Sequence, residues 1–223
     1  MNSTPAVVDL SHVIREGCAH PPTQPGPELA VLRWAGKDGA AATLSQMKIT
    51  THTGTHIDSP AHILPDGATM DAYPIEFFSG HAVCAWVDAE PRQPIEAEQL
   101  ASATGGLLEP GDMLFVGTGW SEHFYDDHYY QHPYLSEAAA RWIVDAGVRI
   151  FGSDTLTPDE PSVSRAHDFH HPVHRILLGA GIPIIENAAR LDQVAGRRFE
   201  VLVAPLKVDA PDGAPCRIVG WTG

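Results

Sequence analysis

The sequence has few cysteines, no excess of positive charge and no long apolar run. Its three cysteines, Cys18, Cys84 and Cys216, lie far apart and include no Cys-x-x-Cys pair, which favours a reducing, cytoplasmic compartment over a disulfide framework. Acidic residues outnumber basic ones by 28 to 14, and the formal net charge of −14 argues against a nucleic-acid partner. Neither a membrane-spanning stretch nor a signal peptide is recognisable. We therefore expect a protein that acts on a small molecule, with no nucleic acid and no membrane partner.

Two common catalytic motifs are absent as well. Gly117-Thr-Gly-Trp-Ser121 follows a predicted strand but does not match Gly-x-Ser-x-Gly, so a glycine-rich turn is favoured over a serine nucleophile. No glycine-rich loop suited to cradling phosphates is present, which disfavours nucleotide substrates.

Histidine, in contrast, is abundant, with 13 in the chain, and three lie in the segment His52-Thr-Gly-Thr-His-Ile-Asp-Ser-Pro-Ala-His62. Neutral imidazole and carboxylate are ligands that proteins offer to zinc, manganese and similar ions. On a straight strand His52 and His56 would be about 13 Å apart, too far for one ion. Gly54 and the β-branched threonines around it disfavour a helix. We expect a metal site where a strand turns at Gly54, with His56 and Asp58 on one face and His52 folded back toward them.

Hydrophobic periodicity predicts one α/β domain over residues 1–223, dominated by strands. A helix is expected at 136–146, capped by Ser136 and closed by Gly147, and another at about 171–179. Residues 43–50 alternate polar and apolar side chains, the pattern of a half-buried strand. Pro/Gly-rich segments at 17–27 and 205–215 are expected to be loops. Strands are predicted at 6–10, 43–50, 80–88, 113–117, 148–152, 182–186 and 199–208.

A second pair of candidate ligands follows the second helix. His174 falls in its first turns, and Glu186 ends the apolar strand Ile182–Ile185. A carboxylate directly after a buried strand is costly unless it is paired, hydrogen-bonded or bound to a metal. Taken alone, Glu186 is as well explained as a cap for a following helix, and His174 as an ordinary helix residue.

These features together resemble the cyclase-type metal-dependent hydrolases, a family that includes bacterial kynurenine formamidases and isatin hydrolases. The resemblance is carried by His52-x-Gly-Thr-His56-x-Asp58-x-Pro60-x-His62, Gly152-x-Asp154-Thr155, and His174 with Glu186 twelve residues later. It implies an α/β fold with a barrel-like mixed sheet, flanking helices and assembly as a homodimer or homotetramer.

The resemblance also implies roles for individual residues. His52, His56 and Asp58 would bind one divalent ion, zinc or manganese, and Asp58 would bridge to a second ion held by His174 and Glu186, giving one or two ions per subunit. His62 would be the catalytic base and acid. From the residues alone, an imidazole there could pass a proton from water to a leaving group, or could instead belong to the metal's first or second shell. Asp154 could orient a ligand histidine or hold a structural turn.

The function implied is a metal-dependent hydrolase that opens an amide C–N bond with activated water, either in an aryl formamide such as N-formylkynurenine or in a cyclic amide such as isatin. In the family's kynurenine formamidases, a tryptophan in a Trp-Pro stretch helps to hold the substrate. This chain has His20-Pro21-Pro22 in that loop. An aromatic pocket could instead be built from Phe77, Phe78, Trp120, Phe124 and Tyr125, although core packing explains at least half of them. The alternatives are an ester or lactone hydrolase on the same site, or a metal-dependent small-molecule binding protein without turnover. A cupin-like dioxygenase is disfavoured.

Overall fold

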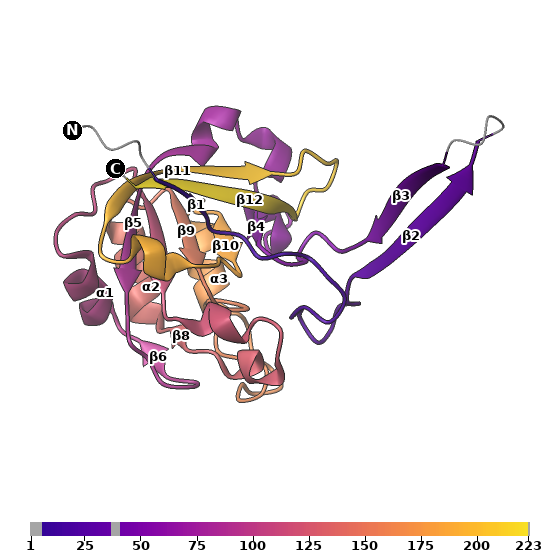
Figure 1. Cartoon of the computed structure of the whole chain (residues 1–223). Coiled ribbons are helices and arrows are strands. Elements are labelled where there is room, and N and C mark those ends of the chain that lie inside the picture. The colour runs from indigo at the N-terminus through magenta and orange to yellow at the C-terminus, as the bar shows by residue number, and fades with distance from the viewer. Residues whose placement is uncertain (1–5, 37–40, 223) are drawn as a thin grey trace.

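A computed structural model describes residues 6–36 and 41–222, and in these residues a mixed β-sheet closes into a barrel (Figure 1). The barrel strands are β4 (His56–Asp58), β5 (Ser79–Trp86), β7 (Met113–Gly117), β9 (Ile150–Ser153), β10 (Ile184–Glu186), β11 (Arg198–Pro205) and β12 (Gly213–Thr222). Their order is β12-β11-β5-β7-β9-β10-β4, and β4 pairs back onto β12 to close the ring. Strand β1 (Ala6–Asp9) pairs with the far end of β12. The expected α/β fold with a barrel-like mixed sheet is confirmed.

The parallel part of the barrel is its most deeply buried part. Strands β5, β7, β9 and β10 run parallel, and every residue of β7 and β9 is buried. Such strands are apolar on both faces because both faces are covered. On β7, Met113 and Phe115 pack into the barrel interior, while Leu114 and Val116 pack outward against the helices.

Three α-helices supply that outer layer: α1 (Ala97–Thr104), α2 (Glu137–Asp145) and α3 (Pro172–Gly179). Ser136 caps α2 by accepting a hydrogen bond from the Ala139 amide, and Gly147 follows with a φ of 72°, both as predicted. Short 3₁₀ helices fill several connections, at Pro60–His62, Met70–Ala72, Ile75–Phe78, Trp120–His123, Asp127–Gln131 and Leu191–Val194.

The seven predicted strands all correspond to strands in the structure, and both predicted helices are present. Five strands and one helix were not predicted. Strands β4, β6 (Pro94–Ile95) and β8 (Tyr134–Leu135) have three residues or fewer, too few for any periodicity to show. Strand β12 begins inside a Pro/Gly-rich segment expected to be a loop, and β2 (Glu28–Ala35) and α1 were missed as well.

The expected half-burial of residues 43–50 is wrong. These residues lie mostly in β3 (Ala41–Lys48), which is a strand but has all eight residues exposed. Strand β3 pairs along its length with β2, and the resulting β2–β3 hairpin projects away from the barrel (Figure 1). The prediction of a strand is therefore correct, but none of the residues that the structure describes covers its apolar side chains.

None of the helices in the described residues has the length and apolar character needed to cross a membrane.

Candidate active site

The histidine motif folds as a turn followed by the short strand β4. His56 and Asp58 are alternate residues of β4 and therefore face the same side. Gly54 has a φ of 67°, and a Cβ there would lie 2.8 Å from Cγ1 of Ile14, so this turn requires glycine. The turn brings His52 back until its Nδ1 lies 2.8 Å from Oδ1 of Asp58. The expected arrangement is present, although the motif opens a second strand instead of ending the strand at 43–50.

Barrel closure brings the second pair of candidate ligands to the same point. Glu186 is the residue of β10 directly opposite His56 on β4. His174 is the third residue of α3, and its side chain is almost fully buried beside them. No helix follows Glu186 directly, and Asn187 has a φ of 57°. A capping role for Glu186 is therefore not supported, and its carboxylate faces the histidines.

The converging atoms have the spacing of neighbouring ligands on a small cation. Nε2 of His56 lies 3.3 Å from Oδ1 of Asp58 and 3.3 Å from Oε2 of Glu186. Nε2 of His174 lies 3.3 Å from Oε1 of Glu186 and 3.5 Å from Oδ2 of Asp58. Two ligands bound at 2.0–2.1 Å in a tetrahedral arrangement are about 3.3 Å apart.

Two of these buried atoms, His56 Nε2 and Asp58 Oδ2, have no hydrogen-bond partner among the described residues. A buried polar atom without a partner costs about 1–3 kcal/mol. A divalent ion would satisfy both at once, so the residues present fit a metal of the nitrogen- and oxygen-binding class.

Each candidate ligand histidine also has an acceptor for its second ring nitrogen. Nε2 of His52 lies 2.9 Å from Oδ2 of Asp212, and Nδ1 of His174 lies 2.6 Å from Oδ2 of Asp159. Nδ1 of His56 lies 2.8 Å from the Gly54 carbonyl. Such partners fix the ring orientation and the tautomer of a metal ligand. Sequence reasoning missed Asp159 and Asp212, because both lie in irregular segments far along the chain from their partners.

The electrostatics of the cluster favour positive charge. Burial alone would lower the pKa of His56, but Asp58 and Glu186 outweigh burial and raise it to about 10. For Asp58 the balance is the reverse. Burial would raise its pKa, and the charges of His52 and His56 together with the His52 hydrogen bond hold it well below the usual value. The buried carboxylates thus require a cation, which can be a set of protons or a metal ion.

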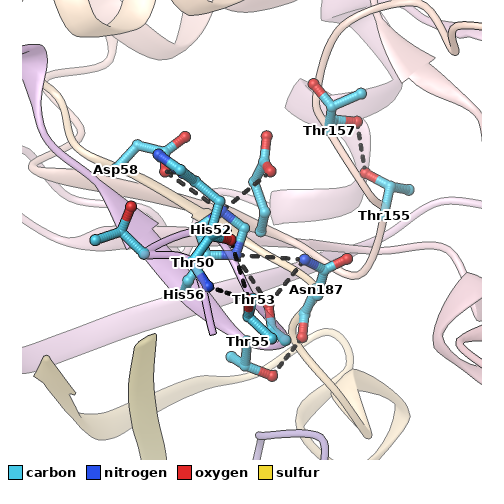
Figure 2. Close-up of polar contacts among 12 residues, drawn as sticks. Thr50, His52, Thr53, Thr55, His56, Asp58, Thr155, Thr157 and Asn187 are labelled. Carbon is cyan, nitrogen blue, oxygen red and sulfur yellow. Dashed lines mark hydrogen bonds and ion pairs between the residues drawn. The ribbon is translucent and has the colours of Figure 1, made fainter. Parts of the chain in front are cut away.

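Asn187 fixes the turn that carries the histidines (Figure 2). The Asn187 side-chain amide donates to the Gly54 carbonyl at 2.9 Å, and the Asn187 main-chain carbonyl accepts from the Thr55 hydroxyl at 2.6 Å. The Tyr129 hydroxyl in turn donates to Oδ1 of Asn187. Asparagine tolerates the left-handed backbone conformation that Asn187 adopts, and this conformation places all three contacts. An asparagine directly after a strand is a sequence signal for such a turn.

Asp154 does not orient a histidine. It accepts hydrogen bonds from the Thr118 amide and hydroxyl and from the Gly119 amide, and so holds the glycine-rich turn after β7. Burial raises its pKa to about 6, against the opposing effect of these bonds. Of the two roles left open for Asp154, the structure supports the structural one, and Asp159 has the orienting position.

His62 lies beside the cluster in the wall of a cavity of about 320 Å³. Its ring centroid is 4.2 Å from that of His52 and 6.0 Å from that of His174. Burial lowers the pKa of His62, which favours a neutral imidazole that can accept a proton. His52, His174 and Glu186 line the same cavity, so a ligand there would contact both His62 and the cluster.

The expected aromatic pocket is not present. None of Phe77, Phe78, Trp120, Phe124 and Tyr125 lines the cavity. Phe78, Trp120 and Phe124 are buried in the hydrophobic clusters, and Tyr125 is exposed. The apolar part of the wall comes from Pro21, Pro22, Ile63 and Leu156, so the loop with prolines in place of tryptophan does reach the site.

Comparisons with known proteins agree with this architecture. Residues 8–160 match the Cyclase family model, described as "Putative cyclase". The chain is 29% identical over 221 residues to a kynurenine formamidase of Salinibacter ruber, covering 96% of each chain. A predicted metal-dependent hydrolase from Bacillus stearothermophilus superposes with a TM-score of 0.79 at 28% identity, covering 99% of this chain and 100% of the other. Isatin hydrolase A from Ralstonia solanacearum shares the fold, with a TM-score of 0.86 at 24% identity over 98% of this chain and 92% of the other. The family match spans more than half of the sequence and includes the whole motif from His52 to His62, so the chain belongs to the Cyclase family.

Proposed function

We propose that this protein is a metal-dependent hydrolase that cleaves an amide C–N bond. The observation that carries the proposal is the convergence of His56, His174, Asp58 and Glu186 at ligand spacing, next to a cavity that also contains His62. Names of the relatives support the amide substrate, because they include kynurenine formamidases and isatin hydrolases.

His52, His56 and Asp58 would hold one ion, and Asp58, His174 and Glu186 a second, with zinc or manganese suited to these nitrogen and oxygen donors. When bound, the metal would lower the pKa of water to about 7 and polarise the substrate carbonyl. Asp159 and Asp212 would keep the imidazoles of His174 and His52 turned toward the centre.

His62 would move the proton of the reaction. Hydrolysis adds a water oxygen to the carbonyl carbon, breaks the C–N bond, and leaves a carboxylic acid and an amine. The neutral His62 imidazole accepts a proton as the water oxygen attacks and returns it to the departing nitrogen. Burial, which lowers the pKa of His62, keeps it in the accepting form at neutral pH.

The testing experiment is hydrolysis of N-formylkynurenine, isatin and a simple cyclic imide by the purified protein, with and without a chelator. Chelator-sensitive loss of the formyl group would identify an aryl formamidase. Turnover of a ring alone would identify a cyclic amidase. Hydrolysis only of esters or lactones, or metal-dependent binding without turnover, would overturn the amide proposal.

Replacing His62 tests its role directly. We expect His62→Ala to retain metal and lose at least about 100-fold in kcat, the usual contribution of a general acid–base. Metal content by elemental analysis and kcat on the best substrate are the two measurements. His123→Ala is the matched control, because His123 lies outside the cavity wall. Loss of metal in His62→Ala would reassign His62 as a ligand.

We further propose that the protein is a homodimer or homotetramer in which the β2–β3 hairpin contacts a second copy. A two-stranded hairpin is only marginally stable in water by itself. This one exposes large apolar side chains on its surface, namely Leu29, Val31, Leu32, Leu44 and Met47. A second copy that covers them would explain both the projection and the composition of the hairpin.

A further inference from the structure

Arg165 stands out among the residues around the cavity. It is half-buried and is the one lysine or arginine in the wall that also contains His62 and Glu186. Its guanidinium makes no ion pair and donates no hydrogen bond to any residue in the part of the chain that the structure describes. What sets Arg165 apart is its place in the cavity wall, where its charge is available to a ligand.

The contacts that position Arg165 come from its own loop and include no acidic group. The Arg165 backbone amide donates to the Pro161 carbonyl at 3.2 Å, and its Cζ lies 5.2 Å from the ring centroid of Phe169. A guanidinium stacked on an aromatic face keeps its N–H donors in the ring plane available to a ligand. Ser162 and Thr157 line the same cavity and can add hydroxyl donors.

The remaining wall limits what the cation can bind. Pro21, Pro22, Ile63 and Leu156 are apolar and suit a flat hydrocarbon ring. The first amides of α3 do not add a further anion site, because Asp159 already accepts hydrogen bonds from the Val173 and His174 amides. One planar cation with five donors matches a singly charged carboxylate, which it can bind through two parallel hydrogen bonds.

We propose that the substrate is an amide that carries a carboxylate, and that Arg165 binds this carboxylate while the scissile carbonyl faces the metal centre. The inference rests on the proposed amide hydrolysis and adds the substrate class. Arg165 is a specificity residue in this scheme: it touches the substrate at the end remote from the C–N bond and takes no part in proton transfer.

The test compares two substrates that differ only in the carboxylate, N-formylkynurenine and its decarboxylated analogue N-formylkynuramine. We expect the metal-loaded enzyme to prefer N-formylkynurenine. Arg165→Met should lower kcat/KM on that substrate about 10- to 100-fold, mainly through KM, because a charge-assisted hydrogen-bond pair is lost. The variant should not lower kcat/KM on N-formylkynuramine, since its chain end carries an ammonium group and no carboxylate, so no attractive contact with Arg165 is removed. Arg165→Lys should fall between, and Arg141→Met, on the exposed face of α2, is the matched control.

Equal losses on both substrates, or no loss on either, would overturn the role of Arg165. If neither formamide is hydrolysed, an aryl formamide is not the substrate, and binding still tests the carboxylate site. In that case the fluorescent carboxylate 2-aminobenzoate is titrated into the metal-loaded protein, with aniline as the neutral comparison. Weaker binding of 2-aminobenzoate to Arg165→Met than to wild type would support the site, and equal binding would refute it.

Discussion

At the scale of single residues, the candidate ligand histidines use both of their ring nitrogens. One nitrogen faces the cluster and the other meets Asp212, Asp159 or a backbone carbonyl. Asp154 and Asp159 are both buried and lie close together in sequence, but they have different roles. Asp154 accepts hydrogen bonds from the turn after β7, and Asp159 fixes the orientation of the His174 ring.

That difference gives a paired prediction. Asp159→Asn should weaken metal affinity about 10- to 100-fold, because the His174 ring loses the partner that fixes its orientation. Asp154→Asn should leave metal affinity unchanged but lower the free energy of unfolding by about 1–3 kcal/mol, because amide donors after β7 lose their buried acceptor. Metal affinity is measured by competition with a chromogenic chelator, and stability by urea unfolding. A loss of affinity in Asp154→Asn equal to that in Asp159→Asn would contradict the assignment.

Reasoning from the residues predicted that His52, His56 and Asp58 converge, because a short local turn determines most of their positions. The resemblance to cyclase-type hydrolases implied that His174 and Glu186 join them, and the structure brings all five side chains together. Asp159 and Asp212 could not be found in this way. Asp212 reaches His52 across 160 residues, where the pairing of β12 with β4 closes the barrel, and Asp159 reaches His174 across 15 residues of the connection between β9 and β10. Periodicity reports local structure and the face of an element, and it contains no information on such long-range pairs.

At the scale of secondary structure elements, the β2–β3 hairpin shows the limit of a burial pattern. Leu44 and Met47 lie three residues apart on β3 and therefore point to opposite faces of the hairpin, and both are about half exposed in the single chain. The apolar side chains on both faces are explained if another copy of the chain buries them, which one sequence cannot reveal.

We therefore expect the double variant Val31→Glu, Leu44→Glu to shift the protein toward monomers, because charged side chains in a contact surface are costly to bury. Sedimentation or light scattering gives the oligomeric state, and circular dichroism checks that the barrel remains folded. Leu107→Glu, an exposed leucine after α1, is the control. An unchanged oligomeric state with a folded barrel would remove the hairpin from the interface.

At the scale of the whole molecule, one ion pair joins the start of β11 to the segment before β7. Nε and Nη2 of Arg198 donate to Oδ2 and Oδ1 of Asp112 at 2.8 and 3.0 Å. Burial alone would raise the pKa of Asp112, but the hydrogen bonds and charge of Arg198 outweigh burial and hold this pKa below its usual value of 3.8. A carboxyl group with a depressed pKa stabilises the folded state above its unfolded pKa, and this contribution is lost as the pH falls through the folded value.

Asp112→Asn should accordingly lower the free energy of unfolding at pH 7 by about 1–2 kcal/mol, after allowance for the partial exposure of Arg198. The difference from wild type should shrink as the pH falls below about 3.8. Urea unfolding at several pH values measures the loss of stability and its dependence on pH. Glu109→Gln serves as the control, because the exposed Glu109 contacts the same guanidinium and should contribute less to the free energy of unfolding. A difference that is independent of pH would show that the charge of Asp112 is not responsible.

The pairing of β4 with β12 has a consequence for how the protein is made. Ligands from residues 52–58 emerge early from the ribosome, but Glu186, Asp212 and the β12 strand that fixes β4 follow more than a hundred residues later. In a nascent chain the candidate ligands His52, His56 and Asp58 are therefore exposed long before the final geometry of the site can form. In the proposed metal centre the full set of ligands comes together only when β10 and β12 have paired with β4, so an ion held by the complete set would mark the completion of folding.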